Sequence, residues 1–140
     1  MSTIRSVVVA LALLLAPFAM QHQVVAGETT SLFVNATTDE SHRAQMALGF
    51  AQKQLERKHP VTIFLNDRGV RIGSLKKSKF KAHREMLAAM MKAGASVYIC
   101  PTCMEKYDVK KKDLMEGIQV GNPDLVGAAL FKDDTRTLTW

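Results

Sequence analysis

The only two thiols of this chain, Cys100 and Cys103, lie three positions apart in the segment Cys-Pro-Thr-Cys. They stand at the end of an apolar run, residues 96–100, whose composition predicts a buried strand. Two cysteines at this spacing can be half of a metal site, a structural disulfide, a redox pair or a sulfur carrier. The neighbouring residues favour some of these interpretations over others.

A metal site or a structural disulfide fits the cysteine segment less well than thiol chemistry does. Zinc requires about four protein ligands, or three and an open position, and this segment supplies only two. Of the histidines after the leader, only His42 is expected near the same edge of the sheet. A disulfide over so short a loop removes little entropy from the unfolded chain. A pair of inert, half-buried cysteines is the remaining structural alternative.

The order of residues predicts different roles for the two cysteines. If Cys100 caps a helical turn that Pro101 begins, its sulfur faces free backbone N–H groups, which stabilise a thiolate. Cys100 is then the expected nucleophile. Cys103, one turn later, is expected to resolve a mixed disulfide or a persulfide on Cys100.

Strands and helices alternate along the rest of the chain. Buried strands are predicted at residues 31–37, 61–66 and 96–100, with a last strand at 135–140. Helices are predicted from the apolar spacing within residues 38–59 and 79–93, with Gly94 as the C-terminal cap of the second. Asn122 and Pro123 predict the start of a last helix. This order predicts a single-domain three-layer α/β/α sandwich with a mostly parallel sheet of about five strands.

The carboxyl ends of parallel strands meet at one edge of a sheet, where ligands gather in such folds. Three polar loops are expected there: residues 35–43, 66–69 and 100–103. We therefore expect Cys100 and Cys103 to be accompanied by ligand-lining residues from the first two loops. These are Asn35, Thr37, His42, Asn66, Asp67 and Arg68.

The first 26 residues have the layout of a secretory signal peptide. Arg5 is followed by an apolar run to Ala19 that is shorter than the roughly 20 residues of a membrane helix, and Ala26 offers a cleavage point. We expect residues 1–26 to be removed and residues 27–140 to form one domain in the periplasm or outside the cell. An uncleaved anchor is the alternative, and Pro17 argues against it. No membrane span is expected after cleavage.

The chain carries 19 Lys and Arg against 13 Asp and Glu, and the lysines bunch at residues 76–84 and 110–112. Such clusters attract anionic partners, although solvated faces and loops are the simpler interpretation. Only Phe80 interleaves with the first cluster, where binding of single-stranded nucleic acid would require several aromatic side chains. No nucleic-acid partner is therefore expected.

The segments 97–100 (VYIC), 66–70 (NDRGV), 32–51 and 116–140 resemble the DsrE/DsrF-like sulfur-relay family, with its DsrE/TusD-like fold. The resemblance implies a cysteine after a central strand that carries a persulfide received from a partner protein, and this role maps onto Cys100. It also implies trimers or hexamers. Two departures stand out: similar sequences often have Gly where this chain has Asp108, and the relay proteins are generally cytoplasmic.

Taken together, these features predict an exported sulfur-carrier or thiol-redox protein with Cys100 as the sulfur-accepting thiol and Cys103 as its resolving partner. Its expected partners are sulfur donor and acceptor proteins or small sulfur compounds, and no cofactor or metal is expected. The alternative is a non-catalytic module of the same fold that binds a small ligand or metal, with a passive disulfide between the two cysteines.

Overall fold

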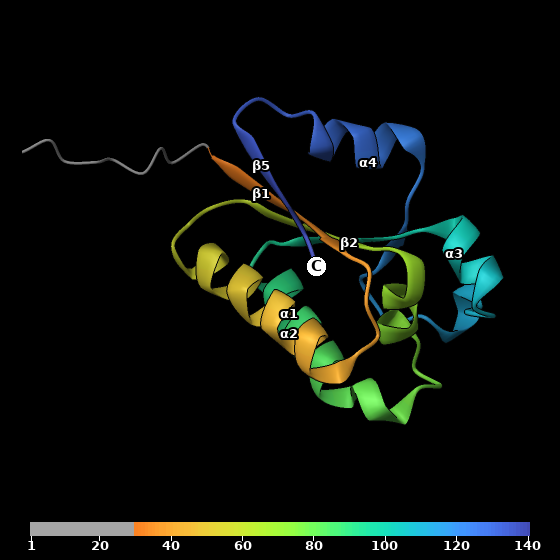
Figure 1. The fold of residues 1–140 in the computed structure, drawn as a ribbon. Helices are drawn as coiled ribbons and strands as arrows, with labels where there is room; N and C mark the ends of the chain where they lie inside the picture. Colours follow the sequence, from red (N-terminus) through yellow and green to blue (C-terminus); the bar gives the residue numbers. More distant parts are fainter. Residues whose placement is uncertain (1–29) are drawn as a thin grey trace, which may run out of the picture.

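A sheet of five parallel strands lies at the centre of residues 30–140, the part of the chain that the computed structural model describes. The proposed signal peptide, residues 1–26, lies outside this part. The strand order is β4-β3-β2-β1-β5, and every pairing is parallel (Figure 1). The strands are β1 (Ser31–Ala36), β2 (Val61–Leu65), β3 (Ser96–Ile99), β4 (Gln119–Val120) and β5 (Thr135–Thr139). The predicted α/β class with a sheet of about five strands is confirmed.

Helices cover the sheet on both faces. They are α1 (Ser41–Glu56), α2 (Lys81–Lys92), α3 (Pro101–Lys106) and α4 (Pro123–Leu130), with 3-10 segments η1 (Asp67–Gly73), η2 (Ser78–Phe80) and η3 (Lys111–Asp113). Figure 1 shows α1 and α2 together on one face of the sheet and α4 alone on the other, with α3 beyond the sheet edge. The fold therefore has the three layers that the sequence predicts.

The two faces of the sheet are covered to different extents. Val34, Ile63 and Val97, from three adjacent strands, are at most 1% exposed and belong to the core packed by α1 and α2. The alternate positions of β2 are only half-buried. The nearly all-apolar run 61–66 predicts burial on both faces, and this is wrong for the α4 face. The eight residues of α4, none of them buried, are too few to cover five strands.

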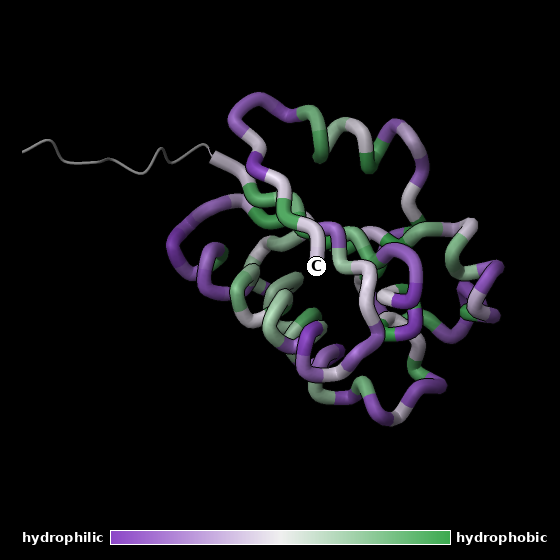
Figure 2. The backbone as a smooth tube through the Cα atoms, viewed as in Figure 1, coloured by the Kyte–Doolittle hydropathy of each residue, from purple (hydrophilic) through white to green (hydrophobic). Residues whose placement is uncertain are grey.

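α1 and α2 bury the faces that their apolar spacing predicts. Leu48 of α1 and Leu87 and Met90 of α2 are at most 1% exposed. Gly94 follows α2 with a φ of 100°, which confirms it as the residue that ends this helix in the left-handed conformation. Figure 2 shows apolar residues concentrated in the strands and hydrophilic residues in the outer loops. No helix within residues 30–140 combines the length and the apolar character that a membrane crossing requires.

His83 and Arg84 correct the interpretation of residues 76–84 as a solvated basic run. Both are buried. The guanidinium of Arg84 donates to the carbonyl oxygens of Ser74 and Lys77 at 2.8 and 2.9 Å. These hydrogen bonds offset part of the cost of burying the charge, and they fasten the segment before α2 to the helix.

Candidate functional site

Cys100 lies between the end of β3 and the start of α3. Its N–H donates to the Leu65 carbonyl oxygen at 3.0 Å, which extends the β-ladder one residue beyond the strand. Pro101 then begins α3, and the Sγ atom of Cys100 accepts a hydrogen bond from the N–H of Cys103 at 3.3 Å. The predicted helix cap is confirmed. The sulfur of Cys100 is thus the acceptor of the helix cap.

Cys103 is held in a different way. Its thiol donates to Oδ1 of Asn66, with 3.0 Å between sulfur and oxygen. Burial raises the pKa of Cys103 to about 11, and the hydrogen bond and charge of Cys100 act in the same direction. At neutral pH Cys103 is therefore a protonated thiol, whereas Cys100 is the sulfur that accepts a hydrogen bond. The two thiols are adjacent but chemically unequal.

The loop that carries Asn66 is fastened to the end of β1. The N–H groups of Asn66 and Gly69 donate to the carbonyl oxygens of Ala36 and Thr37 at 2.9 and 3.2 Å. A Cβ atom at Gly69 would stand 2.1 Å from the Ala36 carbonyl oxygen, so this close approach requires glycine. The Oδ1 of Asn66 also accepts the N–H of Asp67 at 2.9 Å. Asn66 is thus held in place as the acceptor for Cys103.

A chain of polar contacts connects the three loops at this edge. Asp67, which has an uncommon φ of 43°, accepts a hydrogen bond from the hydroxyl of Tyr107. This carboxylate raises the pKa of Tyr107. The guanidinium of Arg71 lies 4.7 Å from the centre of the Tyr107 ring and pairs with Asp39 at 2.7 Å. The prediction that the three loops meet at one edge is confirmed.

Tyr107 and Arg71 were not predicted as site residues. Tyr107 lies four positions after Cys103, so helical spacing along α3 offered a signal that would have identified it. Arg71 offered none, because it reaches Tyr107 and Asp39 only through the folding of η1 against α3 and the loop after β1.

The predicted ligand-lining residues occupy different places. Asn66 contacts Cys103 of α3, and Asp67 contacts Tyr107, the residue directly after α3. Arg68 is exposed, and its charge acts on Tyr107. Thr37 donates its hydroxyl to the carbonyl oxygen of Trp140 at 2.7 Å and so fastens β5. His42 is exposed in the first turn of α1.

Asn35 lies on the α4 face of the sheet rather than among the cysteines. Its Oδ1 is buried and has no hydrogen-bond partner within the described part of the chain. A cavity of about 310 Å³ lies beneath α4 and is lined by Asn35, Asn66, Phe33, Phe64 and Val126, among others. Asn66 therefore lies between this cavity and Cys103.

No three His, Cys, Asp or Glu side chains come together as a metal site within residues 30–140. Cys100 and Cys103 thus have no third such ligand in the region that the structure describes.

Asp108, where similar sequences often have Gly, adopts a φ of 52°. This left-handed conformation costs a non-glycine residue energy, which explains why glycine suits the position. The carboxylate pairs with Nζ of Lys110 at 2.6 Å, and this contact lowers the pKa of Asp108. The turn after α3 therefore forms with Asp108 in place of glycine.

Three solved structures share this fold at low sequence identity. The ychN protein from E.coli has a TM-score of 0.66 and 18% identity, over 80% of this chain and 99% of that one. The protein of unknown function MTH1491 from Methanobacterium thermoautotrophicum has a TM-score of 0.64 and 12% identity, over 79% and 99%. The conserved protein BT1422 from Bacteroides thetaiotaomicron has a TM-score of 0.62 and 19% identity, over 79% and 94%.

Sequence comparison assigns the family. No curated protein sequence is similar enough to count as a relative. The sequence profile of the DsrE/DsrF-like family, however, matches residues 30–136, which include every strand start and both cysteines. The chain therefore belongs to the DsrE/DsrF-like family, whose members are generally sulfur-relay proteins.

Proposed function

We propose that this protein is an exported sulfur carrier in which Cys100 accepts a sulfane sulfur and Cys103 resolves the product. The observation that carries the proposal is the inequality of the two thiols. The sulfur of Cys100 accepts the Cys103 N–H, whereas the thiol of Cys103 donates to Asn66. A nucleophile needs the first environment, and a thiol held in reserve needs the second.

The loading step conserves atoms and electrons. The thiolate of Cys100 attacks the outer sulfur of a donor persulfide, R–S–SH. A new sulfur–sulfur bond forms on Cys100, the sulfur–sulfur bond of the donor breaks, and the donor leaves as the thiolate R–S⁻. The Cys103 N–H donates to the attacking sulfur and so orients it.

Cys103 governs what happens to the bound sulfur. If its thiol loses a proton to solvent, its thiolate attacks the inner sulfur of the Cys100 persulfide, which gives a Cys100–Cys103 disulfide and releases HS⁻. The raised pKa of Cys103 keeps this thiolate scarce at neutral pH. The persulfide therefore persists long enough for the thiolate of an acceptor to take the outer sulfur instead.

The location and the assembly of the carrier are part of the proposal. The leader at residues 1–26 supports export to the periplasm or beyond it. The family resemblance supports a trimer or hexamer, and sulfur donors and acceptors as partners. Intact mass of the protein from the periplasmic or secreted fraction should lack residues 1–26, and a dominant full-length species would contradict export.

A small-ligand-binding module with a passive disulfide is the second candidate. The buried Oδ1 of Asn35, which faces no protein donor beside the cavity under α4, favours it. A ligand with an N–H or O–H group would satisfy this oxygen. In that case the cysteines would show no difference in reactivity after reduction.

Sulfur loading and alkylation distinguish the two candidates. Reduced protein is treated with polysulfide at neutral pH, and the added sulfur is located by mass spectrometry of peptides. We expect loading on Cys100, loss of loading in Cys100→Ser, and retained loading in Cys103→Ser with slower release of sulfide. Equal, slow alkylation of both thiols without any sulfur uptake would exclude the carrier function.

The pH dependence of alkylation provides an independent check. Because the pKa of Cys103 is raised to about 11, its thiolate fraction at neutral pH lies below that of a free cysteine, whose pKa is about 8.5. Alkylation of Cys103 should become fast only as the pH approaches 11. Cys100 should react at neutral pH in the same sample.

A further inference from the structure

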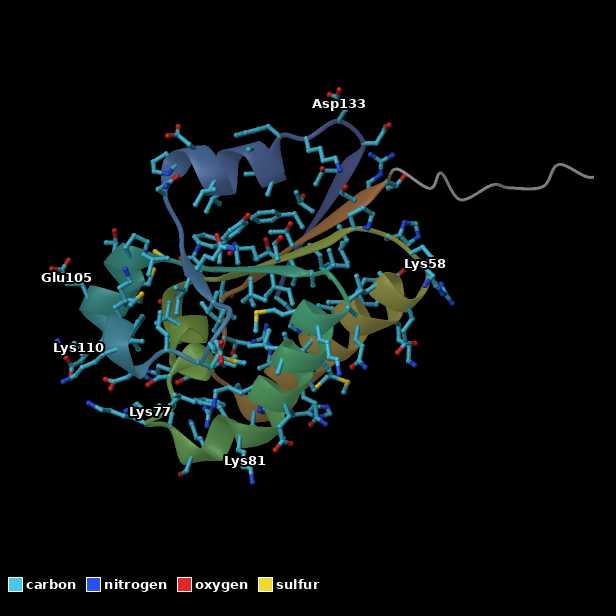
Figure 3. All side chains as sticks on the ribbon, turned by 180° about the vertical axis from the view of Figure 1, so that it is seen from behind. Lys58, Lys77, Lys81, Glu105, Lys110 and Asp133 are labelled. Carbon is cyan, nitrogen blue, oxygen red and sulfur yellow. The ribbon has the colours of Figure 1, made fainter. Side chains whose placement is uncertain are left out.

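Two lysine-rich segments that lie far apart in the sequence meet on one side of the molecule. The N–H of Leu75 donates to the Asp113 carbonyl oxygen at 2.7 Å, and the N–H of Met115 donates to the Gly73 carbonyl oxygen at 3.0 Å. The resulting lysine surface consists of the exposed residues Lys76, Lys77, Lys79, Lys81, Lys106, Lys110, Lys111 and Lys112. Figure 3 shows Lys77, Lys81 and Lys110 along the margin of the molecule that lies below α3.

The lysine surface is held in position by contacts beneath it. The buried guanidinium of Arg84 binds the carbonyl oxygens of Ser74 and Lys77. Lys76 pairs with Asp113 at 3.0 Å, and the Asp113 side chain is only 12% exposed. Backbone and side-chain contacts thus join both segments, so little ordering of their backbone is needed when a partner binds.

Most of the lysines on this surface form no ion pair within residues 30–140. Within residues 30–140, ion pairs involve Lys76, Lys81 and Lys110 of the set. The other five lysines have no such partner in the described chain. They carry a local positive field that attracts anionic surfaces.

An exposed apolar side chain lies among these lysines. Leu75 directly precedes Lys76 and is 58% exposed, whereas Phe80 is fully buried in the core. Its backbone bond to Asp113 places it where the two lysine-rich segments meet, and an apolar side chain beside charged ones is typical of protein interfaces. The lysine surface includes no aromatic side chain that could stack on bases, and this argues against single-stranded nucleic acid as the partner.

The lysine surface begins close to the reactive thiol. Cys100 caps the first turn of α3, and Lys106 is the last residue of this helix. Six helical residues span about 9 Å. A protein bound over Lys106 and Lys110 would therefore reach Cys100 with a side chain of its own.

We infer that the lysine surface, together with Leu75 where its two segments meet, is the docking site for an acidic partner protein that exchanges sulfur with Cys100. This inference rests on the proposed function and specifies the chemistry of the partner. A small sulfur anion would contact only a few of these side chains, whereas eight lysines and a leucine on several segments fit an acidic protein surface. Opposite charge raises the rate of encounter, and Leu75 adds apolar contact.

The test compares two peptide donors of equal length, each with one central cysteine persulfide. One is rich in glutamate, and the other has glutamine at the same positions. At low salt, we expect the acidic peptide to load Cys100 about tenfold faster than the neutral one. Lys77→Glu/Lys111→Glu should abolish this advantage, and salt should reduce it because the contacts are exposed. Equal rates for the two peptides on the wild-type protein would overturn the inference.

The matched control reverses the same number of charges elsewhere. Lys58→Glu/Lys132→Glu changes two exposed lysines away from the lysine surface, and Figure 3 shows Lys58 on the opposite side from Lys110. The control variant should keep the preference for the acidic peptide. If both variants lost the preference for the acidic peptide, the preference would depend on the net charge of the protein and not on this surface, and the inference would be overturned. Glutathione persulfide should load every variant at a similar rate, and a parallel loss with this donor would also overturn it.

Leu75→Ser tests the apolar part of the surface. We expect the acidic peptide to load this variant about threefold to tenfold more slowly, since the apolar contact of Leu75 with the partner would be lost. Unchanged loading would remove Leu75 from the docking site, and with it the apolar contact that the inference requires.

Direct binding separates failure of docking from failure of the sulfur chemistry. If no donor loads Cys100, the proposed function fails, and fluorescence anisotropy of a labelled glutamate-rich peptide without the persulfide decides the docking site. Binding that is lost in Lys77→Glu/Lys111→Glu supports it, and absence of binding overturns it. Binding of phosphatidylserine vesicles or an oligonucleotide, without binding of the peptide, would assign the surface to a membrane or a nucleic acid and overturn the inference.

Discussion

The two faces of the sheet show how one small domain separates stability from accessibility. On the face covered by α1 and α2, side chains such as Val34, Ile63 and Leu87 are completely buried. On the other face, α4 has no buried residue, and cavities of about 340, 310 and 300 Å³ lie beside and beneath it. The free energy of folding therefore comes mainly from the first face. The second face has room for a ligand or another subunit without loss of the core.

The two cysteines lie at the carboxyl edge of the sheet, where the buried face and the open face meet. Cys100 and Cys103 pack against the margin of the core, yet both remain partly exposed. A rigid core beneath the cysteines fixes their geometry, and the open side gives a donor access to the sulfur. Three predictions test how far the packing of the two faces differs.

The largest effect is expected from truncation in the core. Leu48→Ala on α1 should lower the free energy of unfolding by about 3 kcal/mol, because it leaves a cavity in a close-packed region. Leu130→Ala on α4 removes the same atoms from a half-buried position and should cost about 1 kcal/mol or less. Urea denaturation of both variants measures the difference. Equal losses would mean that α4 contributes to the core as fully as α1 does.

An intermediate effect is expected from Gly69→Ala, which connects the core to the site. The new Cβ would meet the Ala36 carbonyl oxygen at 2.1 Å, so the loop after β2 must move. We expect a loss of roughly 1–3 kcal/mol in the free energy of unfolding. We also expect faster alkylation of Cys103, because Asn66 would no longer be held as its acceptor. Gly127→Ala, where nothing lies within 4 Å of the new Cβ, is the control. Unchanged Cys103 reactivity in Gly69→Ala would show that Asn66 is positioned by other contacts.

The smallest effect is expected from Asn122→Ala at the start of α4. The Asn122 side chain accepts the N–H of Leu125 at 2.8 Å, as the predicted cap requires. Its loss should cost about 1 kcal/mol. Because α4 is loosely packed, the cost should appear first as faster amide exchange in residues 123–130, with the core protected. An unchanged exchange rate in α4 would show that the cap does not limit its opening.

Local sequence was sufficient for the elements and for part of the site. The spacing of apolar residues, the caps at Asn122 and Gly94, and the turn between Cys100 and Pro101 each depend on a few neighbouring residues, so they could be predicted. Parallel strands alternating with helices also limit the topology, so the sequence alone predicts that three loops meet at one edge. The positions of Asn66 and Asp67 near the cysteines followed from that rule.

Other features depend on contacts between distant segments. Packing in three dimensions determines three such contacts. Cys103 donates to Asn66, Arg71 contacts Tyr107, and Thr37 binds Trp140 instead of lining the site. A charge pattern likewise does not tell which lysines share a surface. Composition and periodicity therefore determined that this chain forms a parallel α/β domain with a thiol at a strand end. The raised pKa of Cys103 and the meeting of the two lysine-rich segments depend on the folded structure, because burial and long-range hydrogen bonds exist only after the chain has folded.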